Sequence, residues 1–329
     1  MNWRTLVIAV GIVLAQVSSV TKDVQSCAEA MLVQARRLED IRAPGAPPFR
    51  LTATFSFTGD DLEPEHGTYS EIWISNSKWR QETVVGNLHS VAVGGTGKHW
   101  ILFADGFPTQ ADKLPILMAF LPPASLTLEF GSIGEFRNGE LAAECVYTKP
   151  TAEKSRSAFC FDKKSGVLLQ RVSPEMRLRN VVGFSCDYGR FRTFGQYLFP
   201  QEMACFEDQH KSIRAEVVEL SSQPAVDAGS FEPPPGAIEI PECSGKLVAP
   251  FLVSRGFTTP NWDPDRVRWF PVWFLVDAKG KVQDVRLLRS ADKTSYQDAL
   301  NTIEGWSFMP GRCNGEPMTM PYTAEVPVR

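Results

Sequence analysis

Short stretches in which apolar and polar residues alternate recur along the chain between residues 51 and 220. In one of the clearest, Leu51, Ala53, Phe55 and Phe57 alternate with small polar residues. A period of two places one set of side chains on one face of a strand, and turn residues at short spacing favour antiparallel pairing. The pattern predicts a single curled antiparallel sheet or barrel. Its expected strands are residues 51–57, 68–74, 78–85, 88–93, 98–103, 126–130, 141–148, 157–161, 166–172, 184–191, 197–205 and 213–220.

An amphipathic helix is expected before these strands, from Asp23 to Arg42, where a stretch rich in proline and glycine ends it. Apolar residues at helical spacing form one stripe, so we expect this face to pack against other parts of the protein. A second helix is expected at residues 111–121, interrupted by Pro115. The stripe consists of Val24, Cys27, Ala28, Met31, Ala35 and Leu38.

The region from Pro271 to Arg329 has a different organisation. Two apolar stretches, residues 272–276 and 282–288, flank a turn that begins at Asp277. Apolar residues at helical spacing follow, and strict alternation then returns after residue 315. The order predicts a small α+β domain of strand, strand, helix and strand. In its last strand, the face that alternates with Pro321 and Pro327 includes Met318, Met320, Tyr322 and Val326.

The sequence motifs of this region resemble those of the TonB C-terminal domain family over about the last quarter of the chain. The resemblance rests on Val276-Asp277-x-x-Gly280-x-Val282-x-Asp284-Val285, Arg289-Ser290, an Ala299-Leu300 helix, Trp306-x-Phe308-x-Pro310-Gly311 and Asn314-Gly315-x-Pro317. It implies a domain that binds an outer-membrane receptor, a similar envelope protein or peptidoglycan, in part by adding a strand to a sheet edge. Met318, Met320, Tyr322 and Val326 are then candidate partner-binding residues. If this strand is an edge, its prolines either block strand addition or only mark positions that face solvent.

The preceding region resembles the lipoprotein carriers LolA and LolB. The motifs are Glu71-x-Trp73, Lys78-Trp79-Arg80, the segment 161–168, Gly195-x-x-x-Phe199-Pro200 and the proline-rich segment 231–237. The resemblance implies an open barrel, closed by helices over an apolar cavity that suits an acyl chain. In such a barrel Phe55, Phe57, Trp73 and Trp79 are candidate cavity residues, although aromatic residues in a sheet more often belong to its core.

The N-terminus predicts export. An uncharged apolar run from Thr5 to Val20 follows the single basic residue Arg4, with small residues at its end. Such a run is typical of a signal peptide, and it is shorter than the roughly 20 residues that a membrane-spanning helix needs. We therefore expect a periplasmic or exported protein with a cleaved leader. The alternative is an N-terminal anchor in the inner membrane.

Seven cysteines gain significance in an oxidising compartment. Two pairs lie on neighbouring expected strands. In a third pair, one cysteine precedes the C-terminal domain and the other lies in the turn before its last strand. Six paired cysteines allow 15 connectivities, so the sequence alone leaves the pairing open. The remaining Cys27 is expected to be a small buried hydrophobic residue. The candidate pairs are Cys145 with Cys160, Cys186 with Cys205, and Cys243 with Cys313.

Motifs for catalysis are missing from the sequence, which contains neither a Gly-x-Ser-x-Gly nor a phosphate-binding loop. Metal-ligand spacing such as Cys-x-x-Cys is also missing, and the four histidines are scattered. The net charge of −4 does not indicate the excess of basic residues that is typical of proteins that bind nucleic acid. We expect no catalytic residue, no cofactor, no metal and no nucleic-acid partner.

These patterns together predict an α+β protein. An open antiparallel β-barrel with a packed N-terminal helix precedes a small TonB-like β-β-α-β domain. The expected function is non-catalytic: periplasmic protein interaction through the C-terminal domain, linked to outer-membrane transport. The alternative is a lipid or lipoprotein carrier, with a ligand in the cavity of the barrel. The expected boundaries are 1–19 for the signal peptide, 20–221 for the barrel, 222–245 for a linker and 246–329 for the C-terminal domain.

Overall fold

A computed structural model of the 329-residue chain describes most of its length. The expected signal peptide lies outside the described residues. Most of the helix expected at 111–121 also lies outside them, although Leu114 and Met118 are helical. The described residues are 23–58, 64–103, 114, 118–122, 128–138, 141–150, 156–176, 181–207, 211–222, 226–255, 268–288 and 293–328.

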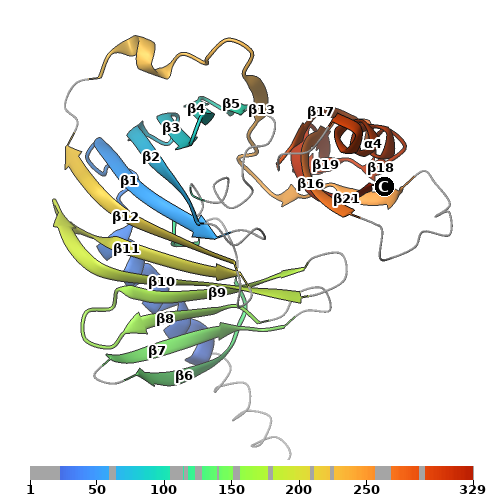
Figure 1. Cartoon of the computed structure of the whole chain (residues 1–329). Coiled ribbons are helices and arrows are strands. Elements are labelled where there is room, and N and C mark those ends of the chain that lie inside the picture. The colour runs from blue at the N-terminus through green and yellow to red at the C-terminus, as the bar shows by residue number, and fades with distance from the viewer. Residues whose placement is uncertain are drawn as a thin grey trace, which may run out of the picture. The chain divides into compact units, whose positions relative to one another are not determined.

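The dominant element is a sheet of thirteen strands in the order β13-β5-β4-β3-β2-β1-β12-β11-β10-β9-β8-β7-β6 (Figure 1). It has two edges, β13 and β6, so it is an open sheet and is not closed into a barrel. Nearly every connection links strands that are neighbours both in sequence and in the sheet. The strands are β1(Phe49–Thr58), β2(Pro64–Ser75), β3(Lys78–Val85), β4(Leu88–Gly95), β5(Lys98–Phe103), β6(Phe130–Asn138), β7(Leu141–Thr148), β8(Ala158–Asp162), β9(Leu168–Met176), β10(Val181–Phe194), β11(Tyr197–Glu207), β12(Lys211–Ser222) and β13(Ile238–Pro241).

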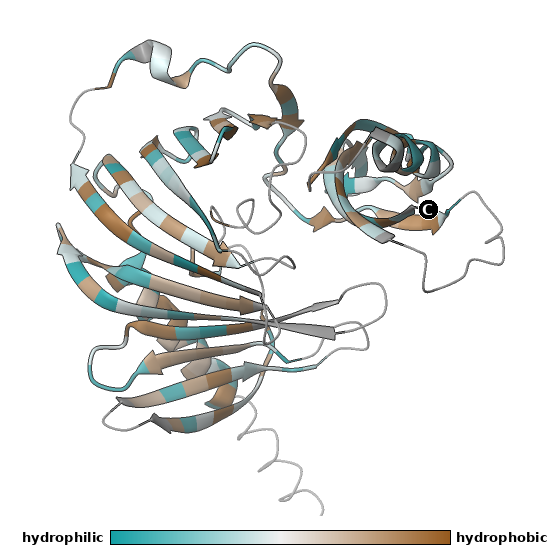
Figure 2. Cartoon of the chain, viewed as in Figure 1, coloured by the Kyte–Doolittle hydropathy of each residue, from teal (hydrophilic) through white to brown (hydrophobic). Residues whose placement is uncertain are grey.

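Alternation along the strands explains why these residues form a sheet. In β1 every second residue, from Phe49 to Phe57, is buried and the residues between are exposed or partly exposed. Figure 2 shows bands of hydrophobic and hydrophilic residues along the strands of the large sheet. The tight turns between β3 and β4 and between β4 and β5 contain Gly86 and Gly97, whose positive φ values of 56° and 71° favour glycine. The observed sheet, with its alternating burial and its tight turns, confirms the antiparallel sheet predicted from the sequence.

The helix of residues 23–39 packs through a stripe that differs from the expected one. Its buried residues are Ala28, Leu32, Ala35 and Glu39, at spacings of four, three and four. The expected stripe is rotated by about one residue, because apolar residues occupy more than one side of this helix. The expectation that Cys27 is buried is therefore wrong: its thiol is free and exposed.

Two disulfides staple neighbouring strands of the large sheet. Cys145 on β7 lies directly opposite Cys160 on β8, and Cys186 on β10 lies opposite Cys205 on β11. A third disulfide joins Cys243 to Cys313 across a sequence separation of 70 residues. These are the three pairs that the sequence suggested.

The segment expected to be a linker contains regular structure. The short 3-10 helix η1(Ala228–Phe231) is followed by β13, which pairs with β5 at one edge of the large sheet. Two side-chain contacts support this pairing: Lys98 Nζ lies 2.8 Å from Glu239 Oε2, and His99 Nδ1 lies 3.1 Å from Glu242 Oε1. The strand escaped prediction because it is four residues long and follows a proline-rich stretch.

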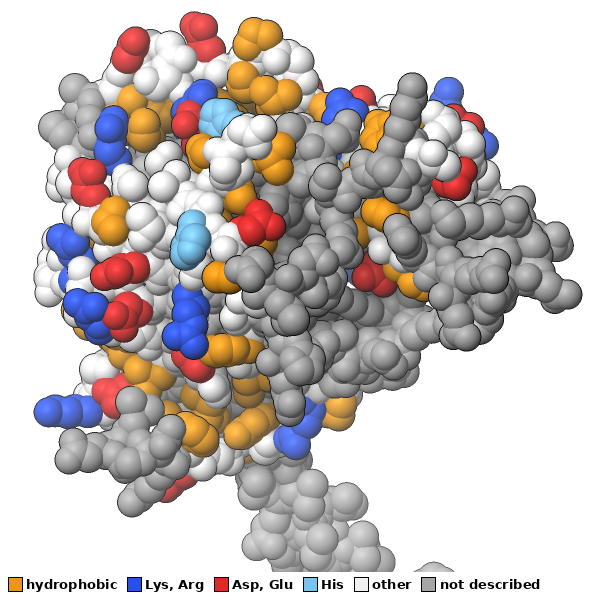
Figure 3. Space-filling view, in the orientation of Figure 1, with side chains coloured by type: hydrophobic (Ala, Val, Ile, Leu, Met, Phe, Trp, Pro, Cys, Tyr) orange, Lys and Arg blue, Asp and Glu red, His pale blue; other side chains and the backbone are white. Residues whose placement is uncertain are grey.

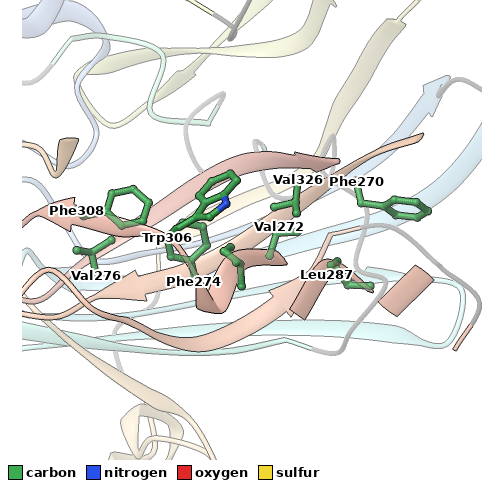
Figure 4. Packing of buried hydrophobic residues seen from close by; sticks show 10 residues of the cluster. Phe270, Val272, Phe274, Val276, Leu287, Trp306, Phe308 and Val326 are labelled. Carbon is green, nitrogen blue, oxygen red and sulfur yellow. The ribbon is translucent and has the colours of Figure 1, made fainter. Parts of the chain in front are cut away.

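The C-terminal region has the predicted order of strand, strand, helix and strand, with short strands added. Ten buried residues form its core, and Figure 4 shows Phe270, Val272, Phe274 and Val276 of one strand packed with Trp306, Phe308 and Val326. The strands form three small sheets with the orders β14-β19-β20, β15-β18 and β17-β16-β21. The elements are β14(Leu247–Val248), β15(Phe251–Ser254), β16(Arg268–Val276), β17(Val282–Leu287), α4(Lys293–Glu304), β18(Ser307–Met309), β19(Gly311–Cys313), β20(Glu316–Met318) and β21(Met320–Val328).

Candidate binding surfaces

An aromatic face covers strands β1 to β3 of the large sheet. The ring of Phe49 stacks on Trp73 at 5.6 Å, and a Cβ added at Gly67 would overlap the ring of Phe55. These contacts place the alternate residues of β1 on the same face as Gly67 and Trp73 of β2. Trp79 of β3 lies opposite Trp73 in the register and therefore joins this face. The structure thus brings together all four candidate cavity residues, Phe55, Phe57, Trp73 and Trp79.

Burial distinguishes these four side chains. Phe55, Phe57 and Trp73 are each exposed by no more than 4%, whereas Trp79 is partly exposed. The indole of Trp79 packs over Gly94 of β4, where a Cβ would overlap it, and lies 6.1 Å from the ring of His99. The aromatic face is therefore a dry apolar layer that reaches solvent at Trp79.

A buried polar pair interrupts this apolar layer. The hydroxyl of Tyr69 donates a hydrogen bond of 3.0 Å to Oε2 of Glu71, and both residues are buried. They are two residues apart on β2 and share a face with Trp73. Sequence reasoning missed this pair, because Glu71 alternates like any polar strand residue while it lies on the buried side. Its signal in the sequence is the row Tyr69, Glu71, Trp73, in which an acidic residue takes the place of an apolar one.

A second buried acid lies at the end of the helix of residues 23–39. Oε2 of Glu39 accepts a hydrogen bond of 2.9 Å from the backbone N–H of Leu168, while Oε1 has no hydrogen-bond partner among the described residues. Burial raises the pKa of Glu39 to about 8, so its carboxyl is mostly protonated at neutral pH. Burial also raises the pKa of Tyr188, for which Glu39 supplies a smaller contribution. Figure 1 shows this helix against strands β7 to β10.

Three arginines hold the short segment of residues 118–122. Arg42 donates to the backbone carbonyl of Met118 at 3.0 Å, Arg171 to that of Phe120 at 3.4 Å, and Arg36 to that of Pro122 at 3.2 Å. The ring of Phe120 packs between two other aromatic rings, 5.0 Å from Tyr188 and 5.6 Å from Phe199. Hydrogen bonds from the three arginines, together with aromatic packing, therefore tie this segment to both the helix and the sheet.

The described residues offer neither a metal site nor a membrane-spanning helix. None of the described His, Cys, Asp and Glu side chains form a group of three or more that could hold a metal ion. No helix in the described part of the chain is long and apolar enough to cross a membrane. On the face of the large sheet in view in Figure 3, acidic and basic side chains are interspersed rather than segregated by sign.

The four candidate partner-binding residues of the C-terminal domain do not form a surface. Val326 is fully buried and Met320 is 5% exposed, while Tyr322 packs 5.1 Å from the ring of Phe308. Met318 lies partly buried on β20 rather than on β21. This alternating face belongs to the core of the domain because it packs toward α4, so the expectation that these side chains meet a partner is corrected to a structural role.

Among the strands that the structure describes, β21 has one unpaired edge, since it ends the order β17-β16-β21. The N–H of Leu288 donates to the carbonyl of Pro271, so the backbone groups of Pro271 face β17. The continuous register of β16 with β21 pairs Pro271 with Glu325. Because backbone groups alternate in direction along a strand, those of residues 321, 323, 325 and 327 face the free edge. Both prolines of β21 therefore lie on the free edge, where their missing N–H groups leave the ladder intact.

An exposed apolar strip lies on β14, β15 and β18 of the same domain. Phe251 of β15 lies opposite Met309 of β18, and they are 68% and 54% exposed. Their sequence neighbours Leu252 and Phe308 form the adjacent pair and belong to the core side. Sequence reasoning missed the strip, because an apolar run predicts burial. We define the apolar strip as Leu247, Val248, Phe251, Val253 and Met309, each at least 48% exposed.

Comparisons with known proteins show only distant likeness. No protein-family model and no curated protein match the chain. An outer membrane lipoprotein-sorting protein domain from Vibrio parahaemolyticus is 13% identical, with 62% of this chain and 97% of that chain covered and a TM-score of 0.41. A LolA superfamily protein from Nitrosomonas europaea is 7% identical, with the same coverage and a TM-score of 0.42. The MucA/MucB complex of Pseudomonas aeruginosa is 12% identical over 90% of this chain and 94% of that chain, with a TM-score of 0.28. Likeness at this level assigns no activity.

Proposed function

We propose that this protein is a non-catalytic lipid or lipoprotein carrier of the cell envelope that holds an acyl chain at the exposed end of its aromatic face, beside Trp79. The observation that supports this most directly is the row of alternate apolar residues on β1, continued by Trp73 and Trp79 on the neighbouring strands. Burial of an acyl chain against such a face is favourable and needs no directional contact. Trp79, the partly exposed member, gives such a chain a point of entry.

The polar pair Tyr69 and Glu71 suits the head of such a ligand. A ligand site is typically apolar with a small number of polar groups that fix orientation. The phenol and the carboxyl both lie on the aromatic face and are already hydrogen-bonded to one another at 3.0 Å. We assign to the Tyr69 hydroxyl the ester or amide carbonyl of a bound lipid, which accepts its hydrogen bond in place of Glu71.

The proposed location is the periplasm, reached through the expected signal peptide at residues 1–19. The three disulfides support it, because structural disulfides persist in oxidising compartments. A carrier in that compartment moves hydrophobic cargo between membranes without catalysis.

Native mass spectrometry of the protein purified from its own envelope tests the proposal. We expect a mass excess that matches a bound lipid. In a titration with a dansyl-labelled fatty acid ester, Tyr69→Phe should bind about fivefold more weakly, since one hydrogen bond is worth about 1 kcal/mol. Tyr147→Phe, on β7 and away from the aromatic face, is the matched control, and thermal unfolding of both variants monitors stability. A bare protein mass, together with no adduct after phospholipid is added, contradicts a carrier.

A second candidate function is protein or peptidoglycan binding by the C-terminal domain, whose motifs resemble the TonB family. The free edge of β21 favours it, because a partner strand can add to an unpaired edge. Only Thr323 and Glu325 offer N–H groups between the two prolines on that edge. Thr323→Pro removes one of these donors and should abolish binding to peptidoglycan sacculi or an outer-membrane protein fraction. Thr323→Val keeps the N–H group and should bind normally; equal binding by both variants would rule out the edge.

A further inference from the structure

The apolar strip is the most exposed hydrophobic feature of the C-terminal domain. Phe251, Val253 and Leu247 are 68%, 61% and 58% exposed, values that single scattered residues reach but that rarely coincide in one segment. They fall within a run of eight uncharged residues, 247–254, which a soluble fold normally buries. Exposed apolar side chains that gather in one short segment and on the strand paired with it mark a candidate site of interaction.

The strip has a rigid support. Leu252 packs against the core cluster and pairs with buried Phe308, so the alternate residues Phe251 and Met309 are directed away from the core. Pro250, between the two short strands, is buried. The core therefore holds Phe251 and Met309 outward, and the exposure of these two side chains follows from the register of β15 with β18.

Positive charge borders the strip at three points. Lys246 precedes the apolar run, Arg255 follows it, and Arg312 of β19 lies directly opposite Val248 of β14. The chain as a whole carries a net charge of −4, so this local charge is opposite in sign to the average. One acidic residue, Glu316, lies on the third strand of the same small sheet.

The charges decide between occupants. A second copy of the chain would bring two sets of three cations together, and like charges across an interface oppose association. A partner that complements the strip needs an apolar interior to receive the apolar side chains, covered by an outer layer of negative charge that pairs with the basic residues. Long basic side chains at the border of an apolar patch extend their charged ends toward such a layer while their stems cover apolar surface.

We infer that the apolar strip docks the protein on the surface of a bilayer that contains anionic lipid. Leu, Val, Phe and Met side chains enter the acyl boundary, and Lys246 and Arg312 contact the phosphates, while the guanidinium of Arg255 packs 5.7 Å from the ring of Trp306. Docking is a separate property from carrying a lipid, because it uses a different domain and needs no ligand.

Vesicle sedimentation tests the inference with the full-length protein. We expect binding to vesicles of phosphatidylcholine mixed with phosphatidylglycerol, weaker binding to phosphatidylcholine alone, and a decrease at high salt. The double variant Phe251→Ser with Val253→Ser should partition at least about tenfold more weakly, because two apolar side chains no longer leave water. The Lys246→Gln variant should lose part of the preference for anionic vesicles.

Phe136→Ser is the matched control, since Phe136 is a 42% exposed phenylalanine on β6 of the large sheet. It should bind vesicles like the unmodified protein. Membrane docking would be overturned if the double variant bound vesicles as well as the unmodified protein does. It would also be overturned if the unmodified protein bound neither vesicle, and an acidic protein would then be the partner to test. Bound protein is measured rather than transferred lipid, so failure of the carrier proposal leaves this outcome unaffected.

Discussion

The carboxyl of Glu39 and the backbone N–H of Leu168, which are 129 residues apart in sequence, form a buried hydrogen bond of 2.9 Å. The bond fixes the end of the N-terminal helix to the start of β9. It also leaves a carboxyl in an apolar environment, where the neutral form is favoured. Folding stability is consequently tied to the protonation of one side chain.

The unfolded carboxyl of Glu39 ionises near 4.5, and the folded one at about 8. Between these values the folded state holds a proton that the unfolded chain releases, so stability falls as the pH rises. The loss reaches at most about 5 kcal/mol above the folded pKa, and it is absent below the unfolded pKa. Urea denaturation near pH 5 and near pH 8.5, followed by circular dichroism, measures it.

Glu39→Gln should remove this pH dependence, because the amide oxygen still accepts from Leu168 and cannot ionise. Near pH 8.5 the variant should be more stable than the unmodified protein. Glu29→Gln, at an exposed position of the same helix, is the control and should keep the original slope. An unchanged slope in Glu39→Gln would assign the pH dependence to another group.

Gly94→Ala tests the packing of the aromatic face. A Cβ at residue 94 would overlap the indole of Trp79, and both residues lie in regular strands. Overpacking of this kind destabilises by about 1–3 kcal/mol. Gly189→Ala in β10 meets nothing within 4 Å and should be neutral or slightly stabilising. Similar unfolding midpoints for the two variants would contradict the tight contact at Trp79.

Gly280→Ala tests the turn between β16 and β17. Gly280 has a φ of +77°, its carbonyl accepts a 3.1 Å hydrogen bond from Phe308, and a Cβ there would overlap the Phe308 carbonyl oxygen. Gly315 has a φ of +90° but open space around it, so Gly315→Ala isolates the backbone strain of about 1 kcal/mol. Gly280→Ala should be at least about 1 kcal/mol worse than Gly315→Ala in chemical denaturation. Equal losses would leave strain alone as the reason for glycine at 280.

Replacing Cys243 and Cys313 by serine should destabilise the C-terminal domain by about 4 kcal/mol, since the closed loop spans 70 residues. The same change at Cys145 and Cys160 opens a loop of 15 residues and should lose about 3 kcal/mol. Cys27→Ser removes only a free exposed thiol and should change little. If loss of the Cys243–Cys313 disulfide left the free energy of unfolding unchanged, the hydrophobic core alone would account for the stability of the domain.

The sequence predicted most strands correctly because a period of two has one structural meaning. It failed where that period is weak. The strand expected near residues 126–130 is β6 at Phe130–Asn138, a segment with two glycines and little alternation. The four-residue β13 has too few residues to show a period.

Site residues were harder to predict than strands, because burial depends on what packs against a side chain. The stripe of the N-terminal helix was misplaced by one residue, which exposed Cys27 and buried Glu39. Likewise, the alternation on β21 identified one face but could not say whether it met α4 or a partner. The apolar strip shows the converse: Phe251 looks like a core residue in sequence, and its register with Met309 keeps it in water.

The position of β13 has a mechanical consequence. Any pulling force on the C-terminal domain reaches the large sheet through residue 242, immediately after a strand held by four paired residues to β5. The Cys243–Cys313 disulfide bypasses the chain between these cysteines, a sequence separation of 70 residues, so a force applied beyond Cys313 also enters the large sheet next to residue 242. β13 is the shortest strand of the large sheet and the first to bear this tension, so we expect it to detach from β5 before the other strands separate.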